Sequence, residues 1–239
     1  MIGLMGAMEE EIRLFQDYAD IDKKQSIAGM KFYTGHIDDR EVVMVKCGVG
    51  KVHAAVSTQI LIDKFDVDEI ILAGLAGSVV PYLQRGDIVM ANYLVQHDVD
   101  LTAFGRRLGE VPSVGRMMEA DPIMLRRMNK AYDEVFAGRS DRPQMVVGTI
   151  VSGDKFISDK NIIASLQREF GAVATEMEGA AVAQVCLMNS RPFVVVRTIS
   201  DDASEGAGDQ FNHTLEMAPI NTFAVIRRFL GMQETVPAY

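Results

Sequence analysis

The sequence predicts an α/β protein with three layers, in which helices cover both faces of a central mixed, largely parallel and twisted sheet. Short runs rich in Val and Ile occur at residues 2–7, 42–47, 70–73 and 193–199. These runs do not alternate between apolar and polar residues, which is typical of strands covered on both faces. The runs stop at Gly, Ser or Asp, and sequence of helical period follows, so strands and helices alternate along the chain.

The remaining elements follow from the same patterns. Residues 9–18 and 51–65 have helical period directly after an apolar run, and residues 32–36 and 41–46 have the pattern of a hairpin. Further helices are expected at residues 124–136, 161–170, 178–188 and 211–230. With no repeat, linker or low-complexity segment, we expect one domain over residues 1–232 and a frayed tail over residues 233–239.

The composition excludes several classes of protein. A chain of 239 residues with 48% hydrophobic and 24% charged residues is typical of one large globular domain. A formal net charge of −9 disfavours nucleic acid and anionic membranes as partners, because phosphate groups bind clustered Lys and Arg. No apolar run is long enough to span a membrane.

The start of the chain and the two cysteines bear on location. Residues 2–7 are apolar, but they have no basic flank and meet three glutamates, which favours a buried strand over a signal peptide. Cys47 and Cys186 both lie in apolar sequence, which favours buried thiols in a reducing compartment over a disulfide. We therefore expect a cytoplasmic protein.

Familiar cofactor and metal motifs are missing from the sequence. Gly48-Val49-Gly50 begins like a dinucleotide fingerprint, but His53 occupies the place of the third glycine. The four histidines lack metal-ligand spacing, and no serine lies in a Gly-x-Ser-x-Gly elbow. Ser152-Gly153-Asp154 is interpreted as a turn. No metal and no cofactor are expected.

Candidate acid and base groups lie where strands end. Ligands of open α/β sheets bind beyond the carboxyl ends of the strands, which selects residues 8–11, 48–51, 74–78, 152–157 and 200–203. Asp201 follows a strand that must be buried, so desolvation would let it hold a proton near neutral pH, although a helix cap or turn explains it equally well. Glu9, Glu10 and Glu11 begin a helix, where at most one of them can face a cleft. Together the carboxylates indicate an enzyme that uses acid and base catalysis.

Six segments of the sequence occur together in one known family. They are residues 3–11, 48–52, 97–105, 151–157, 176–181 and 194–201. Taken in order, they cover nearly the whole chain, apart from residues 106–120, 137–142 and the tail. By these segments the chain resembles the 5′-methylthioadenosine/S-adenosylhomocysteine nucleosidases of the nucleoside phosphorylase-like superfamily.

The resemblance implies hydrolysis of the bond between adenine and ribose in 5′-methylthioadenosine, S-adenosylhomocysteine and 5′-deoxyadenosine. Protonation of the purine N7 makes adenine a neutral leaving group, and the resemblance assigns this acid to Asp201, oriented by Ser200. The sugar becomes oxocarbenium-like, and a base on the opposite face takes a proton from water. The resemblance assigns this base to Glu11 and places Arg197 near the water.

The resemblance also implies a set of substrate-binding residues. Glu178 would accept hydrogen bonds from the ribose hydroxyls, with Met177 packed on the sugar, while Phe156 stacks on the purine and the backbone of Ile157 reads its edge. Met8, Val49 and Phe211 would line the pocket for the 5′-alkylthio group, and Ala76, Gly77 and Glu176 complete the site. The family implies a homodimer in which Leu101 and Phe104 of the partner subunit close this pocket.

The sequence departs from the family at two places. Leu75 stands where relatives have a serine that helps to hold the water, and Ser78 comes from a different place in the turn. Arg106 follows the segment that reaches the partner, and we expect it to face solvent. Two alternatives remain: a phosphate-dependent nucleoside phosphorylase, which the glutamates at residues 9–11 disfavour, and an adenosine-binding relative without turnover.

Overall fold

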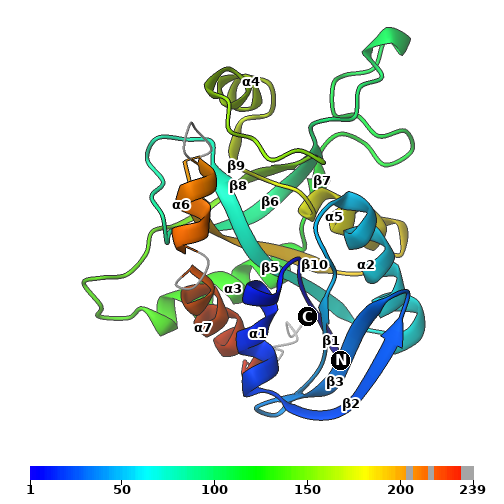
Figure 1. Cartoon of the computed structure of the whole chain (residues 1–239), viewed down its shortest axis with the longest axis vertical. Helices are drawn as coiled ribbons and strands as arrows, with labels where there is room; N and C mark the ends of the chain where they lie inside the picture. Colours follow the sequence, from blue (N-terminus) through cyan, green and yellow to red (C-terminus); the bar gives the residue numbers. More distant parts are fainter. Residues whose placement is uncertain (203–206, 215–217, 233–239) are drawn as a thin grey trace, which may run out of the picture.

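A computed structural model describes residues 1–202, 207–214 and 218–232 (Figure 1). The strands are β1 (Ile2–Gly6), β2 (Asp20–Ile27), β3 (Met30–Ile37), β4 (Arg40–Lys46), β5 (Glu69–Ser78), β6 (Ile88–Gln96), β7 (Met118–Glu119), β8 (Met145–Ser152), β9 (Ala172–Glu176) and β10 (Phe193–Asp201). The helices are α1 (Glu9–Tyr18), α2 (Lys51–Phe65), the 3₁₀ helix η1 (Thr102–Phe104), α3 (Pro122–Val135), α4 (Lys160–Phe170), α5 (Gly179–Met188), α6 (Ala207–Thr214) and α7 (Ala218–Leu230).

The strands form one mixed sheet in the order β10-β6-β8-β9-β5-β1-β4-β3-β2, with β7 beside β6. Parallel pairing joins β4, β1, β5 and β10, and it also joins β6, β8 and β9. Because β5 pairs with both β9 and β10, the strands β5, β10, β6, β8 and β9 close into a ring, from which β1, β4, β3 and β2 extend as an open wing. The predicted α/β class with a mixed sheet is confirmed, and the closed ring is a feature that the sequence patterns did not indicate.

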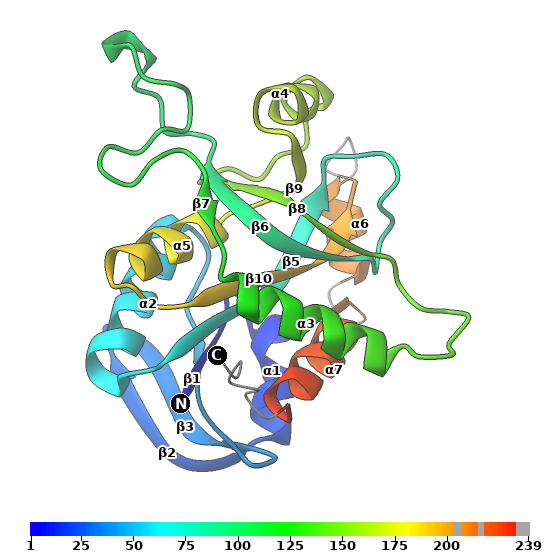
Figure 2. The same cartoon turned by 180° about the vertical axis from the view of Figure 1, so that it is seen from behind.

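Helices cover both faces of the sheet, as Figures 1 and 2 show from opposite sides. Helices α1, α3 and α7 pack on one face, and α2 and α5 pack on the other. On β1, Leu4 joins the core beneath α1 and α7, whereas its neighbour Met5 joins the core beneath α2 and α5. Successive strand residues point to opposite faces, so two buried faces explain why the run has no polar alternation.

The helix predicted over residues 211–230 is described in two parts, α6 and α7, and residues 215–217 between them lie outside the described residues. Helix α6 packs against β10, whereas α7 packs against α1 and α3 as well. The predicted hairpin is confirmed, since β3 and β4 pair antiparallel. The strand β2 was not predicted, because its mostly exposed residues form the outer edge of the wing and carry charge instead of an apolar run. The predicted tail lies outside the described residues.

Two further expectations concern cysteines and membranes. Cys47 and Cys186 are both free and buried, so the alternative of a disulfide is contradicted. Across the described residues, no helix combines the length and the apolar character needed to cross a bilayer.

Candidate active site

A cavity of about 400 Å³ lies beyond the carboxyl ends of β1, β5 and β10. The loops that the strand-end rule selected meet here. The cavity is lined by Ala7, Met8, Glu11, Val49, Leu75, Ala76, Gly77, Phe156, Thr175, Met177, Glu178, Ser200, Asp201, Gly208 and Phe211. The lining therefore includes both candidate carboxylates, Glu11 and Asp201, together with aromatic and aliphatic walls.

Glu11 belongs to the first turn of α1, and its side chain turns back to the end of β1. One carboxylate oxygen accepts hydrogen bonds from the backbone N–H groups of Ala7 (2.6 Å) and Met8 (3.0 Å), and the other accepts one from Leu75 N–H (2.8 Å). Burial raises the pKa of Glu11, and this effect outweighs the nearby Arg197 and the three N–H donors, which lower it. Glu9 faces outward instead and pairs with Lys46 (3.1 Å).

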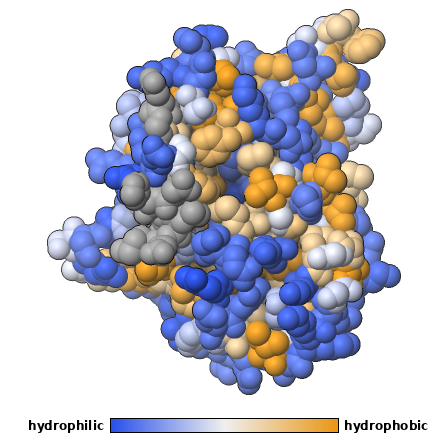
Figure 3. Space-filling view, viewed as in Figure 1, coloured by the Kyte–Doolittle hydropathy of each residue, from blue (hydrophilic) through white to orange (hydrophobic). Residues whose placement is uncertain are grey.

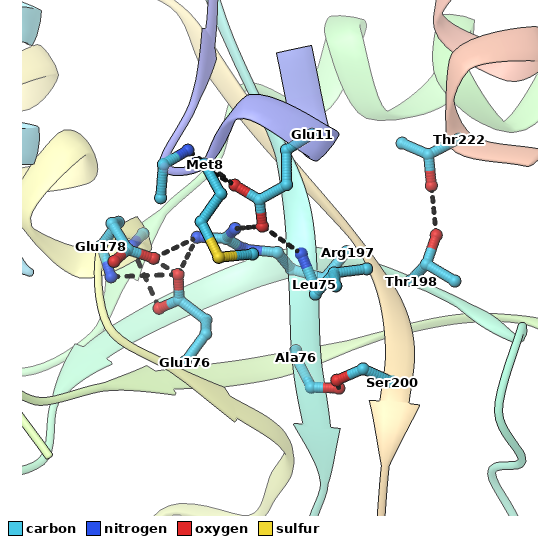
Figure 4. Close-up of polar contacts among 12 residues, drawn as sticks. Met8, Glu11, Leu75, Ala76, Glu176, Glu178, Arg197, Thr198, Ser200 and Thr222 are labelled. Atoms are coloured by element: carbon cyan, nitrogen blue, oxygen red, sulfur yellow. Dashed lines mark hydrogen bonds and ion pairs between the residues drawn. The ribbon is translucent and has the colours of Figure 1, made fainter. Parts of the chain in front are cut away.

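Arg197 lies behind the cavity, fully buried among three glutamates (Figure 4). Its Nη2 contacts carboxylate oxygens of Glu176 and Glu178, the latter at 3.1 Å, and its Nη1 lies 3.9 Å from Glu11 Oε1. One fully buried guanidinium thus faces three carboxylates whose side chains are at most 5% exposed. This close approach depends on Gly74, because a Cβ at that position would clash with the Arg197 guanidinium and lie 2.7 Å from Glu11 Oε1.

The pKa of Glu178 reflects the excess of carboxylates over positive charge. Its burial raises its pKa to about 7, and the neighbouring Glu176 and Glu11 add to the rise, while Arg197 and the Gly50 N–H oppose it. The Gly50 N–H donates to Glu178 Oε1 at 2.8 Å, so the start of α2 fixes this side chain at the cavity wall.

Glu176 does not line the cavity but anchors Arg197 from behind. Its carboxylate accepts hydrogen bonds from the hydroxyl of Ser152 and from the N–H groups of Glu178 (3.1 Å) and Gly179 (2.8 Å). The same hydroxyl accepts a hydrogen bond from Ala180 N–H (2.7 Å). The Ser152 hydroxyl therefore links β8 to the start of α5, a role that the interpretation of this segment as a turn did not predict.

Ser200 and Asp201, both buried, line the cavity at the end of β10. The Ser200 hydroxyl donates to Asp201 Oδ2 at 2.6 Å and lies 3.3 Å from the carbonyl oxygen of Ala76. The register between β10 and β5 shifts between Ile199 and Asp201, and such a bulge re-aims the side chains at a strand end. The bulge explains how consecutive residues both reach the site.

Two aromatic side chains that contact each other, Phe156 and Phe211, line the cavity. The rings of Phe156 and Phe211 lie 6.0 Å apart in an edge-to-face arrangement. Ile157, by contrast, packs into a separate core with Leu166 and Phe170, so its side chain points away from the cavity. Leu101 and Phe104 also lie outside the cavity lining, and the side chain of Phe104 is 82% exposed.

Four lining residues were not among the candidates: Ala7, Leu75, Thr175 and Gly208. Ala7 ends the first apolar run, but nothing in the sequence distinguishes Thr175 or Gly208 from other small residues. Leu75, noted only as a departure, donates its backbone N–H to Glu11 and lines the cavity. Ser78 cannot replace the missing serine, because its hydroxyl donates to Val80 O (2.7 Å). Arg106 pairs with Glu110 at the surface (2.6 Å).

The carboxylates of the site suit acid and base chemistry. Three glutamates converge on one guanidinium. Within the described ranges, no group of three or more His, Cys, Asp and Glu side chains is placed to hold a metal ion. The cavity presents the carboxylates of Glu11, Glu178 and Asp201 together with the aromatic rings of Phe156 and Phe211.

Comparisons with known proteins agree with the resemblance in the sequence. The family model of the phosphorylase superfamily matches residues 1–231. A 5′-methylthioadenosine/S-adenosylhomocysteine nucleosidase from Bacillus pumilus is 39% identical over 230 residues, which cover 96% of this chain and 97% of that protein. The chain belongs to this nucleosidase family of the phosphorylase superfamily.

Solved structures of the nucleosidase family share the whole fold. The enzyme from Colwellia psychrerythraea, in complex with adenine, is 36% identical, with a TM-score of 0.91 over 96% of this chain and 94% of that chain. The enzyme from Neisseria meningitidis, in complex with methylthio-immucillin-A, is 34% identical, with a TM-score of 0.90 over 95% of this chain and 97% of that one. The strands and loops that build the cavity fall within these matched lengths.

Proposed function

We propose that this protein hydrolyses the N-glycosidic bond of 5′-methylthioadenosine and S-adenosylhomocysteine, and also of 5′-deoxyadenosine, to release adenine and the 5′-substituted ribose. The observation that carries the proposal is one cavity lined by both Glu11 and Asp201. Two carboxylates in different surroundings can divide the roles of base and acid. The nucleosidases similar to this chain support the substrate class.

At the purine end, Asp201 donates a proton to N7 as the C1′–N9 bond breaks and its electron pair moves into the purine. Ser200 donates to Oδ2 of Asp201 and so orients the carboxyl group. Phe156 stacks on the purine, and the backbone of Ile157 reads the purine edge, since its side chain is committed to the core. The backbone at Ala76 and Gly77 completes this end.

At the ribose end, Glu11 removes a proton from the attacking water while the water oxygen bonds to C1′. The raised pKa of Glu11 makes its carboxylate a better proton acceptor than an exposed one. Glu178 accepts hydrogen bonds from the ribose hydroxyls, and Met177 packs on the sugar. Three carboxylates against one Arg197 leave an excess of negative charge, which stabilises the developing oxocarbenium cation.

Water, not phosphate, is the nucleophile that suits this cavity. A phosphate near the first-strand loop would need hydrogen bonds from the backbone N–H groups of that loop. The N–H groups of Ala7 and Met8 already donate to Glu11. The like charges would repel by about 4 kcal/mol at about 4 Å and an effective dielectric of about 20. Methylthioadenosine is therefore incubated with the protein in phosphate-free buffer and adenine is followed by chromatography. Release that requires added phosphate would make the protein a phosphorylase.

The competing function is an adenosine-binding protein without turnover, and Leu75 is the observation that favours it. The apolar side chain at this place supplies no hydrogen bond to a water. The presence of both Glu11 and Asp201 favours an enzyme, because binding alone does not need an acid and a base. The same assay separates the two functions, since a binder would retain the nucleoside without releasing adenine.

We propose further that the protein is a homodimer in which Leu101 and Phe104 of the partner subunit close the pocket lined by Met8, Val49 and Phe211. The dimer is supported by exposed apolar side chains on α2 and α5, which pack side by side. Val52 and Met188 are each at least 70% exposed. Light scattering should give twice the monomer mass for the wild type and the monomer mass for Val52→Asp combined with Met188→Asp. Monomeric wild-type protein would refute the dimer.

We propose a single domain over residues 1–232, since β1 and β10 both pair with β5 and α7 packs against α1. We place the protein in the cytoplasm, on the ground that Cys47 and Cys186 are free thiols. The net charge of −9 supports a small-molecule substrate over nucleic acid.

A further inference from the structure

Three hydrogen bonds join Lys51, Asp98 and Asp154 in a closed triangle, which has no role in the proposed reaction as described so far. The Lys51 ammonium donates to Asp98 Oδ1 at 2.6 Å, and the backbone N–H of Lys51 donates to Asp154 Oδ1 at 2.8 Å. The backbone N–H of Asp154 donates to the other oxygen of Asp98, Oδ2, at 3.1 Å, which closes the triangle. We name these three residues the junction.

The junction joins three segments that lie far apart in the sequence. Lys51 is the first residue of α2, whereas Asp98 and Asp154 follow the ends of β6 and β8. These two strands run parallel, and their last residues, Gln96 and Ser152, are partners in the register. Each aspartate therefore lies two residues beyond a paired strand end, so the sheet itself brings them together. The start of α2 is then held against both.

Both sides of the junction continue directly into the active-site cavity. Gly50, which precedes Lys51, donates its N–H to Glu178 Oε1 at 2.8 Å. It adopts a φ of 98°, and a Cβ at this position would lie 3.1 Å from Asp154 Oδ1, so α2 approaches the loop closely. On the other side, Phe156 follows Asp154 by two residues and lines the cavity. Figure 3 shows that the surface on this side of the molecule is hollowed near its centre, with hydrophobic residues beside the hollow.

The junction depends on the charge of Asp98 as well as on its shape. Burial raises the pKa of Asp98, but the hydrogen bonds from Lys51 and from the Asp154 N–H outweigh this effect and leave the pKa lowered. The side chains of Lys51 and Asp98 are 17% and 33% exposed. Each carboxylate oxygen meets its own donor, so an asparagine would turn its NH₂ group toward one of two donors.

We propose that Asp98 is a positioning residue for both halves of the nucleoside, which holds the loop of Phe156 through Asp154 and the start of α2 through Lys51. The inference rests on the proposed function, because it needs Phe156 at the purine and Glu178 at the ribose hydroxyls. Asp98 does not line the cavity, so it acts on the substrate only through these neighbours.

The test uses Asp98→Asn in the full chain, with methylthioadenosine, its 2′-deoxy counterpart and adenine as an inhibitor. We expect KM for methylthioadenosine to rise about 10-fold and kcat to change less than about 2-fold, because the contacts act on the bound substrate and the transition state alike. The inhibition constant of adenine, which reports on the purine side, should rise about 5-fold. The ratio of kcat/KM for methylthioadenosine to that for the 2′-deoxy substrate should fall about 5-fold, because Glu178 is displaced from the ribose hydroxyls.

The substrate ratio separates positioning from damage to the fold, since a smaller fraction of folded enzyme lowers both rates equally. Lys51→Met removes the other partner of the ion pair and should change the adenine constant and the ratio in the same direction. The double variant should give a KM within about 2-fold of the larger single effect, because residues of one network are not additive. The matched control is Asp66→Asn at the opposite end of α2, where Asp66 pairs with Arg191 at 2.8 Å. It should leave all three quantities unchanged.

Two results would count against different parts of the proposal. If either the adenine inhibition constant or the substrate ratio keeps its wild-type value in both Asp98→Asn and Lys51→Met, the dual positioning role is overturned while the nucleosidase activity stands. If the wild type releases no adenine from methylthioadenosine, the proposed function is overturned instead. Titration calorimetry with adenine then decides the role of Asp98 at the purine, and equal affinities in the wild type and in Asp98→Asn would overturn it.

Discussion

The two ends of the active-site cavity hold their acidic groups by different means. At the ribose end, Glu11 accepts three backbone N–H groups and shares a buried guanidinium with Glu176 and Glu178. At the purine end, Asp201 lies beside the Ser200 hydroxyl at the bulged end of β10. Around Glu11, the N–H groups and Arg197 favour the ionised form, whereas burial favours the protonated form and prevails, so the pKa is raised. The contrast teaches that the two roles follow from surroundings, since all these groups are carboxylates.

The largest expected effect is at the purine end. Asp201→Asn keeps the shape but removes the transferable proton, so kcat should fall about 1,000-fold, in the range of general acid catalysis. Binding of an uncleavable C-nucleoside analogue of methylthioadenosine should change less than about 3-fold, because the cavity walls stay in place. Adenine release and titration calorimetry measure the two quantities. Unchanged turnover in this variant would remove Asp201 from the mechanism and with it the contrast between the ends.

The second prediction concerns the pH dependence of stability at the ribose end. The fold raises the pKa of Glu178 from 4.5 to about 7, so the folded state favours its protonated form. This group therefore stabilises the fold fully below pH 4.5, and the contribution is lost as the pH rises through about 7. In Glu178→Gln the side chain is neutral at every pH, so this variant does not lose stability in this way as the pH rises. Its free energy of unfolding relative to wild type should rise by about 2 kcal/mol between pH 5 and pH 8.

Urea unfolding at both pH values measures this difference. The substitution also changes contacts with Arg197 and Gly50, but those changes act at both pH values and largely cancel in the comparison. Glu41→Gln, at an exposed position on β4, serves as the control and should give a difference independent of pH. A flat difference for Glu178→Gln would mean that Arg197 fully compensates the three carboxylates.

The sequence predicts the two carboxylates of the site but not the long-range contacts that support them. Asp201 follows a long apolar run and Glu11 follows another, so the strand-end rule finds both from one sequence. The role of Ser152 could not be found, because its partner Glu176 is 24 residues away and the contact depends on the pairing of β8 with β9. The same holds for the closed ring of strands, which requires β5 to pair with both β9 and β10. Local patterns predict where strands end, whereas long-range pairing decides which ends meet.

A third prediction tests whether Glu176 acts through Arg197. Glu176→Gln removes one of the three charges, and a Gln side chain can still meet the Ser152 hydroxyl and the N–H groups of α5. With less negative charge nearby, the pKa of Glu11 should fall, so the acid limb of the kcat profile should move to lower pH. We expect kcat at neutral pH to fall about 10-fold, because Arg197 loses its anchor.

The pH profile separates this positioning role from simple damage to the fold. Ser152→Ala perturbs the same contact but leaves the charge on Glu176, so its acid limb should keep the wild-type position. If both variants lose activity but keep the acid limb of the kcat profile at the wild-type pH, Glu176 serves the fold alone. Its charge then has no part in setting the pKa of Glu11.

The smallest expected effect is at Leu75, where the ribose end lacks a hydroxyl. The backbone N–H of this residue already donates to Glu11 Oε1 (2.8 Å), and the residue lines the cavity but has no polar side-chain atom. Leu75→Ser keeps the N–H and adds a group that can hydrogen-bond the attacking water, so kcat should rise about 3-fold, which corresponds to about 0.7 kcal/mol. Leu75→Ala, which opens the same space without a hydroxyl, is the matched control and should not raise kcat. Equal gains in both variants would show that the space available, and not a hydrogen bond, limits the placement of the water. A loss of kcat in Leu75→Ser alone would show that Arg197 and Glu11 already position the water.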